Sequence, residues 1–239
     1  MKLVHIYLFA IPVCALMSSC QSAAILSAGF ESDVINNPPA TNLSGAPSGD
    51  VIQYNAALDP QLKVQNSTIA GSKALHFTNI GIADVPALER WVKFKGIGTD
   101  LTKTIWFTHT GQNTGASHDL FIDLTDGFAH LFARMRISSD GQVALAKNLA
   151  DNYTDVIGNI GSQVHTIIFT TTPSVLKYNV TIFTTNGPTI TVENKPMITT
   201  DALSFNNPAY PTLSFQHSKE TGSGHTYAIG SVSISKKKP

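Results

Sequence analysis

The fold is decided by residues 117–136, which read SHDLFIDLTDGFAHLFARMR. Leucine and isoleucine occupy every second position before Asp126, and the residues after His130 alternate in the same way. Alternation with a period of two is typical of a β-strand with one buried face. Asp126-Gly127 separates the two halves and is favoured in a two-residue type I′ turn, because both central residues of that turn need positive φ. The stretch therefore predicts a β-hairpin.

The expected turn sets the register of this hairpin. Ile122 would face Leu131 on the core side, because a two-residue turn places Thr125 opposite Phe128. The other face would pair Asp123 with His130, Phe121 with Phe132, and Asp119 with Arg134. Side chains directly opposite each other lie close enough to interact. We therefore expect a row of carboxylate–imidazole, aromatic and ion pairs on this face.

The polar face of the hairpin is the strongest candidate for a binding site. Its residues are Asp119, Phe121, Asp123, His130, Phe132, Arg134 and Arg136. Aromatic rings can stack on sugars, while carboxylates and guanidinium groups hydrogen-bond to hydroxyls. The alternative interpretation is a solvated face, or one whose two phenylalanines pack beneath the loop expected over Asn36–Asp50.

The rest of the chain also has the pattern of a β protein. Short runs rich in Val, Ile, Phe and Thr alternate with clusters of Gly, Asn, Asp and Pro. Ser139-Asp140-Gly141 suits a three-residue turn with a left-handed glycine, which would return Val143 and Leu145 to the core face. Strands are expected at Ala74–Phe77, Trp91–Phe94, Lys103–Thr108, His118–Leu124, His130–Ser138, Gln142–Lys147, Val164–Thr170, Leu176–Thr184, Thr189–Val192, Thr212–His217 and Tyr227–Ser235, with one helical turn at Ala83–Arg90.

The N-terminus carries the pattern of an export signal. Lys2 precedes an apolar stretch that is too short to anchor in a bilayer and ends at Ser18-Ser19-Cys20. This ending resembles the lipobox of bacterial lipoproteins, in which the cysteine sulfur carries a diacylglycerol. We expect a signal peptide at 1–19, a lipidated tether at 20–28, a single β-sandwich domain at 29–235 and a basic tail at 236–239. The alternative is an ordinary secretory signal with a coincidental cysteine.

Composition restricts the possible partners. Lys and Arg balance Asp and Glu at 16 each, and only 13% of residues are charged, so no basic field is available for nucleic acid. Cys14 lies inside the expected signal peptide, which leaves no cysteine pair for a disulfide. The membrane contact would be the lipid anchor alone. Gln21 after the cysteine favours the outer membrane if the cell envelope is Gram-negative.

The order of the elements resembles the concanavalin A-like lectin/glucanase superfamily, in particular the laminin-G-like domains of exported bacterial proteins. The segments that carry this are Gly29–Ser32, Gly71–Phe77, Thr104–Thr108, Arg136–Val143, Val164–Phe169, Tyr178–Phe183 and Ala228–Ile234. The resemblance implies an all-β, two-sheet antiparallel jelly-roll sandwich with one concave face. It also implies glycan or protein binding, and in some members polysaccharide cleavage.

Many members of this superfamily hold a structural calcium. Glu31 or Asp33 could supply an early ligand, but Gly230 and Ser231 stand where the late ligand would be. Calcium prefers six to eight oxygen ligands. We therefore predict no cofactor and keep Glu31 and Asp33 only as weak calcium candidates.

Catalytic patterns are sparse. The laminarinase-type Glu-x-Asp-x-x-Glu strand is absent, and Asp119 and Asp123 lie about 13 Å apart along a strand, too far for the two carboxyl groups of a glycosidase. A lyase could use His130, Arg134 and Arg136 with a tyrosine such as Tyr178 or Tyr227. We expect a lipid-anchored binding module for a glycan or an extracellular protein. The alternatives are a polysaccharide lyase and a structural or adhesive envelope lipoprotein.

The anchor is tested by replacing Cys20 with Ala. The variant should leave the membrane fraction while its thermal melting stays unchanged, because the lipid is attached outside the folded domain. Metabolic labelling with a palmitate analogue checks the modification directly. Equal labelling of the two proteins would contradict the lipoprotein assignment.

Overall fold

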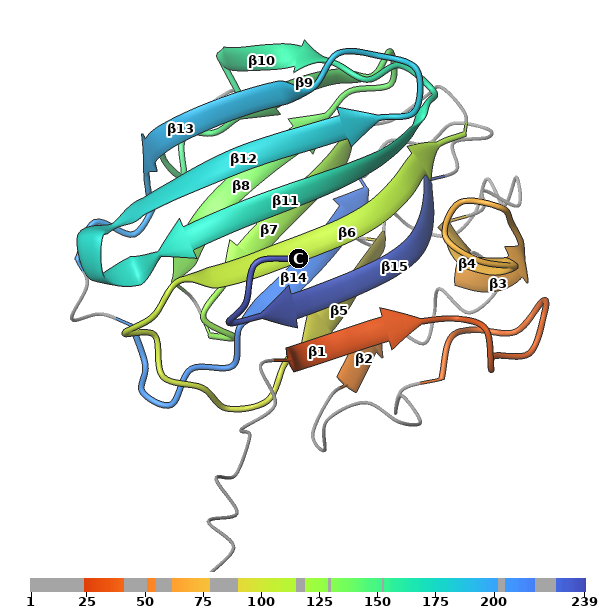
Figure 1. The fold of residues 1–239 in the computed structure, drawn as a ribbon, viewed down its shortest axis with the longest axis horizontal. Helices are drawn as coiled ribbons and strands as arrows, with labels where there is room; N and C mark the ends of the chain where they lie inside the picture. Colours follow the sequence, from red (N-terminus) through yellow and green to blue (C-terminus); the bar gives the residue numbers. More distant parts are fainter. Residues whose placement is uncertain are drawn as a thin grey trace, which may run out of the picture.

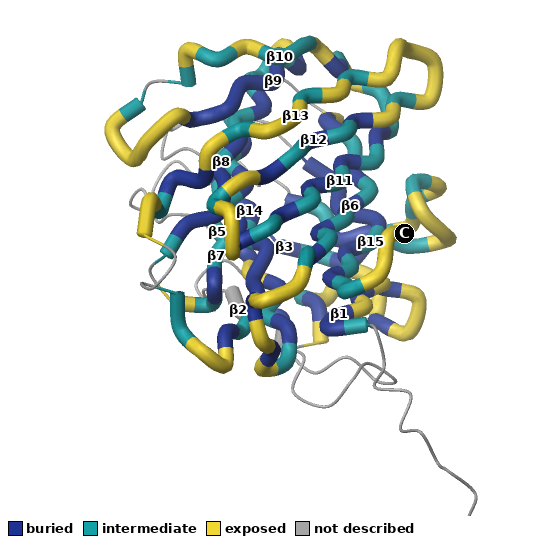
Figure 2. Tube along the Cα trace, turned by 60° about the vertical axis from the view of Figure 1, so that its left-hand side comes forward, coloured by how far each residue is buried: buried dark blue, intermediate teal, exposed yellow. Residues whose placement is uncertain are grey.

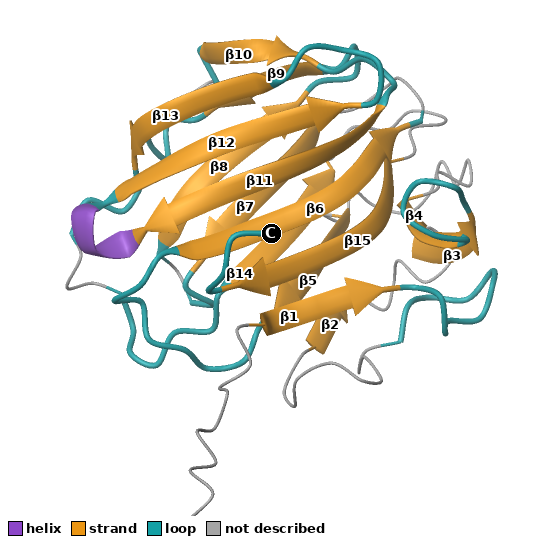
Figure 3. Ribbon diagram, in the orientation of Figure 1, coloured by secondary structure: helices purple, strands orange, loops and turns teal. Residues whose placement is uncertain are grey.

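The computed structural model describes residues 24–40, 51–54, 62–77, 90–114, 119–128, 130–151, 153–201, 205–217 and 227–239. These residues form antiparallel strands and one 3-10 turn, η2 (Pro173–Val175), which is the purple segment of Figure 3. The described residues include no helix with the length and apolar character needed to cross a membrane. Cys20, the expected signal peptide and most of Ala83–Arg90 lie outside the described residues.

One sheet has eight strands and faces the viewer in Figure 1. Its order is β13 (Ile190–Pro196), β12 (Lys177–Thr184), β11 (Val164–Thr172), β6 (Ile105–Asn113), β15 (Tyr227–Ser235), β4 (Lys73–Phe77) and β3 (Leu62–Asn66), with β1 (Ala24–Gly29) also paired to β15.

The other sheet has seven strands and lies behind the first in Figure 1. Its order is β10 (Asp155–Asn159), β9 (Gln142–Leu145), β8 (Leu131–Ile137), β7 (Leu120–Thr125), β14 (Thr212–His217), β5 (Arg90–Lys95) and β2 (Val51–Tyr54).

The core lies between the two sheets, where buried residues gather in Figure 2. Alternation along the strands places apolar side chains inward, as Val92 and Phe94 of β5 and Phe107 of β6 illustrate. The inner faces of packed sheets interdigitate in this way. The two-sheet antiparallel sandwich confirms the predicted fold class.

Differences from the sequence prediction occur at the margins of the sheets. β1 occupies residues assigned to the tether, because Ile25 and Leu26 are buried against the sandwich. The strands β2, β3 and β10 were not predicted; they are four or five residues long, and β10 is a half-exposed edge strand without clear alternation. The turn at Ser139-Asp140-Gly141 is confirmed, since Gly141 has a φ of 83° and Ile137 pairs with Val143.

A polar network is buried within this apolar core. The Tyr227 hydroxyl lies 3.1 Å from His109 Nε2 and 2.7 Å from His165 Nε2, and all three side chains are at most 1% exposed. His165 Nδ1 lies 2.9 Å from the Gln163 carbonyl oxygen and must donate to it. His165 Nε2 therefore accepts from Tyr227, and His109 Nε2 donates to Tyr227. Both imidazoles are neutral in this arrangement, and among the described residues His109 Nδ1 has no hydrogen-bond partner.

Burial lowers the pKa of His165 from its usual 6.5 to about 4, against the opposing effect of the Gln163 carbonyl. Burial, reinforced by His165, also lowers the pKa of His109 well below its usual value. Unfolded chains take up these protons near pH 6.5, whereas the folded protein does so only at lower pH. Stability should therefore be retained above pH 6.5 and fall as the pH drops below it.

We predict that the free energy of unfolding falls between pH 7 and pH 5, because below about pH 6.5 the unfolded chain takes up protons on these two histidines that the folded protein does not. Urea denaturation at the two pH values measures this loss. His165→Gln keeps an amide near Tyr227 but cannot titrate, so its loss should be smaller by roughly 2 kcal/mol. Equal losses in the two proteins would show that His165 is not buried as a neutral group.

Candidate functional site

The connection between β7 and β8 is held by the buried carboxylate of Asp126. Its Oδ1 accepts the Phe128 amide at 2.9 Å and the His130 amide at 3.3 Å, and its Oδ2 lies 2.8 Å from His130 Nδ1. Asn206, which is 80 positions later, donates its amide and side-chain nitrogen to Oδ2 at 3.2 and 3.1 Å. Burial opposes ionisation, but these hydrogen bonds lower the pKa of Asp126 overall. The carboxylate therefore organises a loop.

Gly127 is required in this loop for two reasons. Its φ is 87°, and a Cβ at this position would lie 2.3 Å from the Tyr210 carbonyl oxygen. The prediction of positive φ at Gly127 is confirmed. The prediction of a two-residue turn is wrong, because β7 ends at Thr125 and β8 begins only at Leu131.

The longer loop changes the register of the hairpin. Ile122 pairs with Met135 instead of Leu131, a shift of four residues. The predicted outer-face partners are therefore corrected. Asp123 pairs with Arg134 instead of His130, Phe121 pairs with Arg136 instead of Phe132, and Asp119 contacts Arg136 instead of Arg134. Because four is an even number, Phe121, Asp123, Arg134 and Arg136 keep the outer face assigned to them.

Phe132 does not belong to the proposed ligand face. The register shifts between Leu124 and Thr125, and this bulge turns Phe132 inward until it is fully buried. Its ring contacts Phe107 of the opposite sheet at 6.0 Å and Phe205 at 5.0 Å between centroids. The same bulge moves Leu131 out of the main core. Leu131 instead belongs to a small separate cluster with Ala146, Ile198 and Tyr153. Phe132 therefore contributes core packing.

Part of the outer face is neutralised and covered. Arg134 donates Nε and Nη2 to the two Asp123 oxygens at 2.7 Å each, and these hydrogen bonds raise the pKa of Arg134. Arg136 Nη1 lies 3.7 Å from Asp119 Oδ2. Tyr153, from the segment between β9 and β10, lies over Phe121 with centroids 5.3 Å apart. Tyr153 is thus the described residue that covers Phe121, whereas residues 41–50 of the predicted Asn36–Asp50 loop lie outside the described residues.

The neighbouring part of this face is hollowed by a groove of about 230 Å³ that crosses β5, β14 and β7. Its walls combine exposed aromatic surface with polar side chains. The residues are Trp91, Lys93, Lys95, Asp123, Thr125, Gly127, Phe128, Thr212, Ser214 and Gln216. Phe128 is 54% exposed and meets the Tyr210 ring edge-on at 6.0 Å.

Strand register explains why these residues meet. Ser214 pairs with Lys93 on one side and Asp123 on the other, and Gln216 pairs with Trp91 in the same way. Of the seven predicted residues, only Asp123 lines the groove. The sequence predicted a strand at Trp91–Phe94 but assigned none of its side chains to a site. It carried no information that β5 would lie one strand away from β7.

The tyrosines proposed for a lyase lie in the wrong place. Tyr178 and Tyr227 are 2% and 0% exposed and belong to the core, away from Arg134 and Arg136. Tyr153 is the tyrosine near the arginines, as its ring lies 5.4 Å from Arg136 Cζ. Burial raises the pKa of Tyr153 to about 12, which disfavours the phenolate that a base would need. His130 is bound to Asp126 in the loop.

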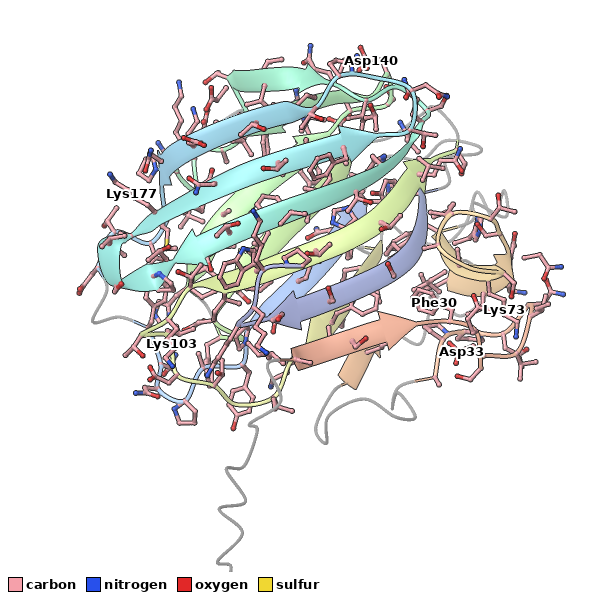
Figure 4. All side chains as sticks on the ribbon, in the orientation of Figure 1. Phe30, Asp33, Lys73, Lys103, Asp140 and Lys177 are labelled. Atoms are coloured by element: carbon pink, nitrogen blue, oxygen red, sulfur yellow. The ribbon has the colours of Figure 1, made fainter. Side chains whose placement is uncertain are left out.

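The calcium candidates lie at the end of β1. Glu31 accepts the Ser72 amide at 2.7 Å and the Lys73 amide at 3.1 Å and bonds the Ser72 hydroxyl, which fastens the β3–β4 turn. Asp33 lies beside Lys73 in Figure 4, and Lys73 Nζ donates to its carbonyl at 2.7 Å. The described residues contain no group of three or more metal-ligating side chains. The Glu31 carboxylate is thus engaged by the β3–β4 turn, and calcium binding at Glu31 or Asp33 stays a prediction.

Comparisons with known proteins identify the fold. The chain is similar to the Lotus tetragonolobus seed lectin (TM-score 0.51, 8% identity, 86% of this chain and 98% of the lectin). It is also similar to the binding domain of botulinum neurotoxin DC in complex with rat synaptotagmin II, with a TM-score of 0.52 and 14% identity over 91% of this chain and 49% of the toxin chain. A sialidase has a TM-score of 0.51 and 12% identity over 90% of this chain and 18% of the sialidase. This chain thus spans about half of the toxin domain and under a fifth of the sialidase.

No protein-family model and no curated protein matches the sequence. At such low identities, structural likeness shows the fold alone. The chain has the lectin-like, concanavalin A-like β-sandwich fold that its strand pattern predicted.

Proposed function

We propose that this protein binds a glycan in the groove across β5, β14 and β7. The main support is the composition of that groove. Trp91 and the exposed Phe128 line it together with side chains that bear hydroxyl, amide and ammonium groups. Flat rings can stack on the apolar face of a sugar, and the polar groups can hydrogen-bond its hydroxyls. Binding sites generally combine apolar walls with a few placed polar groups in this way.

The size of the groove supports recognition of part of a longer ligand. Its 230 Å³ is below the roughly 300–1,000 Å³ of pockets that enclose a drug-sized molecule. The groove lies on the outer face of a sheet, where a saccharide chain could continue beyond it. A short stretch of sugars is therefore the proposed binding unit.

The similar structures support a binding role for this fold. One is named a seed lectin, and another is the binding domain of a neurotoxin in complex with a protein. An extracellular protein is therefore the second candidate partner. The aromatic surface beside hydroxyl and amide groups favours the glycan.

We further propose that the module is exported and lipid-anchored through Cys20. The support is the N-terminal pattern of one lysine, an apolar stretch and Ser18-Ser19 before the cysteine. A lipid at that position would hold the domain at a bacterial membrane surface, with the outer membrane as the expected site in a Gram-negative envelope. The binding face would then meet polysaccharides outside the cell.

Trp91→Ala tests the groove, and the second tryptophan of the chain provides a matched control. Trp106 lies half-buried on the outer face of β6 in the opposite sheet. A glycan array with the purified protein identifies a bound saccharide, and calorimetry measures its affinity. Trp91→Ala should weaken binding at least tenfold, about 1.4 kcal/mol, as expected for an interface aromatic.

Trp106→Ala should leave the affinity unchanged, and neither variant should prevent folding, because both rings lie outside the core. Equal affinity of Trp91→Ala and the unmodified protein would contradict binding in this groove. Loss of binding in both variants would point to a structural effect of tryptophan removal.

A further inference from the structure

The groove carries two lysines whose charges are not matched by a described carboxylate. Lys93 and Lys95 are alternate residues of β5, so their Cα atoms lie roughly 7 Å apart along the outer face. The Lys93 ammonium lies 4.8 Å from the centroid of Trp91, and the Lys95 ammonium lies 4.7 Å from that of Tyr210. Aromatic rings attract an ammonium but carry no net charge. Both positive charges therefore persist in the groove.

The acidic residues around the groove are already engaged. Asp123, the one carboxylate that lines it, is bound by Arg134 through two hydrogen bonds of 2.7 Å. The Asp126 carboxylate accepts bonds from the loop and from Asn206. In the described part of the chain, the ion pairs of this sheet join other residues than Lys93 and Lys95. Among the residues that line the groove, Lys93 and Lys95 are thus the two charged side chains without an oppositely charged partner in the described part of the chain.

Other surfaces of the sandwich differ in charge. The outer face of β6 and β11 presents uncharged side chains such as Thr108, Thr110, Thr166 and Thr170. Lys195, which lies on β13, is paired with Asp155 at 2.6 Å. The C-terminal run Lys236–Lys238 is the main competing basic cluster, and it lies outside the groove.

From this arrangement we propose that the ligand is an acidic saccharide, in which Lys93 and Lys95 bind carboxylate or sulfate groups. The inference rests on the proposed function and names the class of glycan. A sugar in the groove would place its acidic group near the two ammonium groups. The cation–π contact of an exposed lysine is weak, so an anion can draw Lys93 from the Trp91 ring and leave that ring for the sugar. Lysine binds such anions as a point charge.

The test compares each acidic saccharide with a counterpart of the same backbone that lacks one kind of acidic group. Calorimetry with the purified protein uses hexagalacturonate, its carboxyl-reduced form, chondroitin sulfate and unsulfated chondroitin. The first pair isolates the carboxylate and the second isolates the sulfate. We expect at least tenfold tighter binding of an acidic member than of its counterpart, decreasing as salt is raised.

The double variant Lys93→Gln/Lys95→Gln should lose this preference for the more acidic member of the pair while keeping any affinity for carboxyl-reduced hexagalacturonate. The control replaces Lys236, Lys237 and Lys238 with Gln, which removes more positive charge outside the groove, and it should retain the preference. If the preference for the acidic saccharide were lost in the Lys236–Lys238 variant but kept in the Lys93/Lys95 variant, the inference would be overturned. That result would show nonspecific binding to the C-terminus.

Two further results would overturn the inference that the ligand is acidic. They differ in whether the proposed glycan-binding function survives. Binding of neutral saccharides that is lost in Trp91→Ala but unaffected by the lysine changes would leave the proposed glycan function in place. Absence of binding to every saccharide on the array and in the calorimeter would remove the proposed function as well.

Discussion

The buried carboxylate of Asp126 holds together the loop and strands next to the proposed binding groove. It satisfies two backbone amides of its own loop and fastens that loop to Asn206. A buried carboxylate without such donors would be costly. The loop conformation is therefore determined by one side chain and its donors. Its length sets the register of β7 against β8, and through the register it decides which side chains stand opposite one another.

Two halves of the outer face differ as a result. Over β7 and β8, the register brings Asp123 to Arg134, and Tyr153 covers Phe121, so this half is neutral and partly closed. Over β5 and β14, aromatic and polar side chains surround an open groove. The same loop presents Phe128 at one side of that groove. The proposed site is therefore built from aromatic surface and unpaired lysines instead of the paired charges that the hairpin alone suggested.

The alternation of side chains was enough to predict the fold class and most strands, because a period of two directly reports which face is buried. It also assigned Phe121, Asp123, Arg134 and Arg136 to the outer face despite the wrong register. Phe132 could not be placed, because its inward turn depends on a bulge whose neighbouring loop is fixed by Asn206. The groove could not be found either, since β5, β14 and β7 come from three distant segments that only the sheet order brings together.

An NMR titration can locate the proposed binding site on the protein. Adding hexagalacturonate to ¹⁵N-labelled protein should shift the amide signals of residues 91–95, 123–128 and 212–216 most strongly. A second cavity at the edge of the sandwich, lined by Asp100, Leu101, Pro173 and Phe205 among others, provides a comparison within the same spectrum. Largest shifts around that cavity, or on the outer face of β6 and β11, would contradict a binding site in the groove.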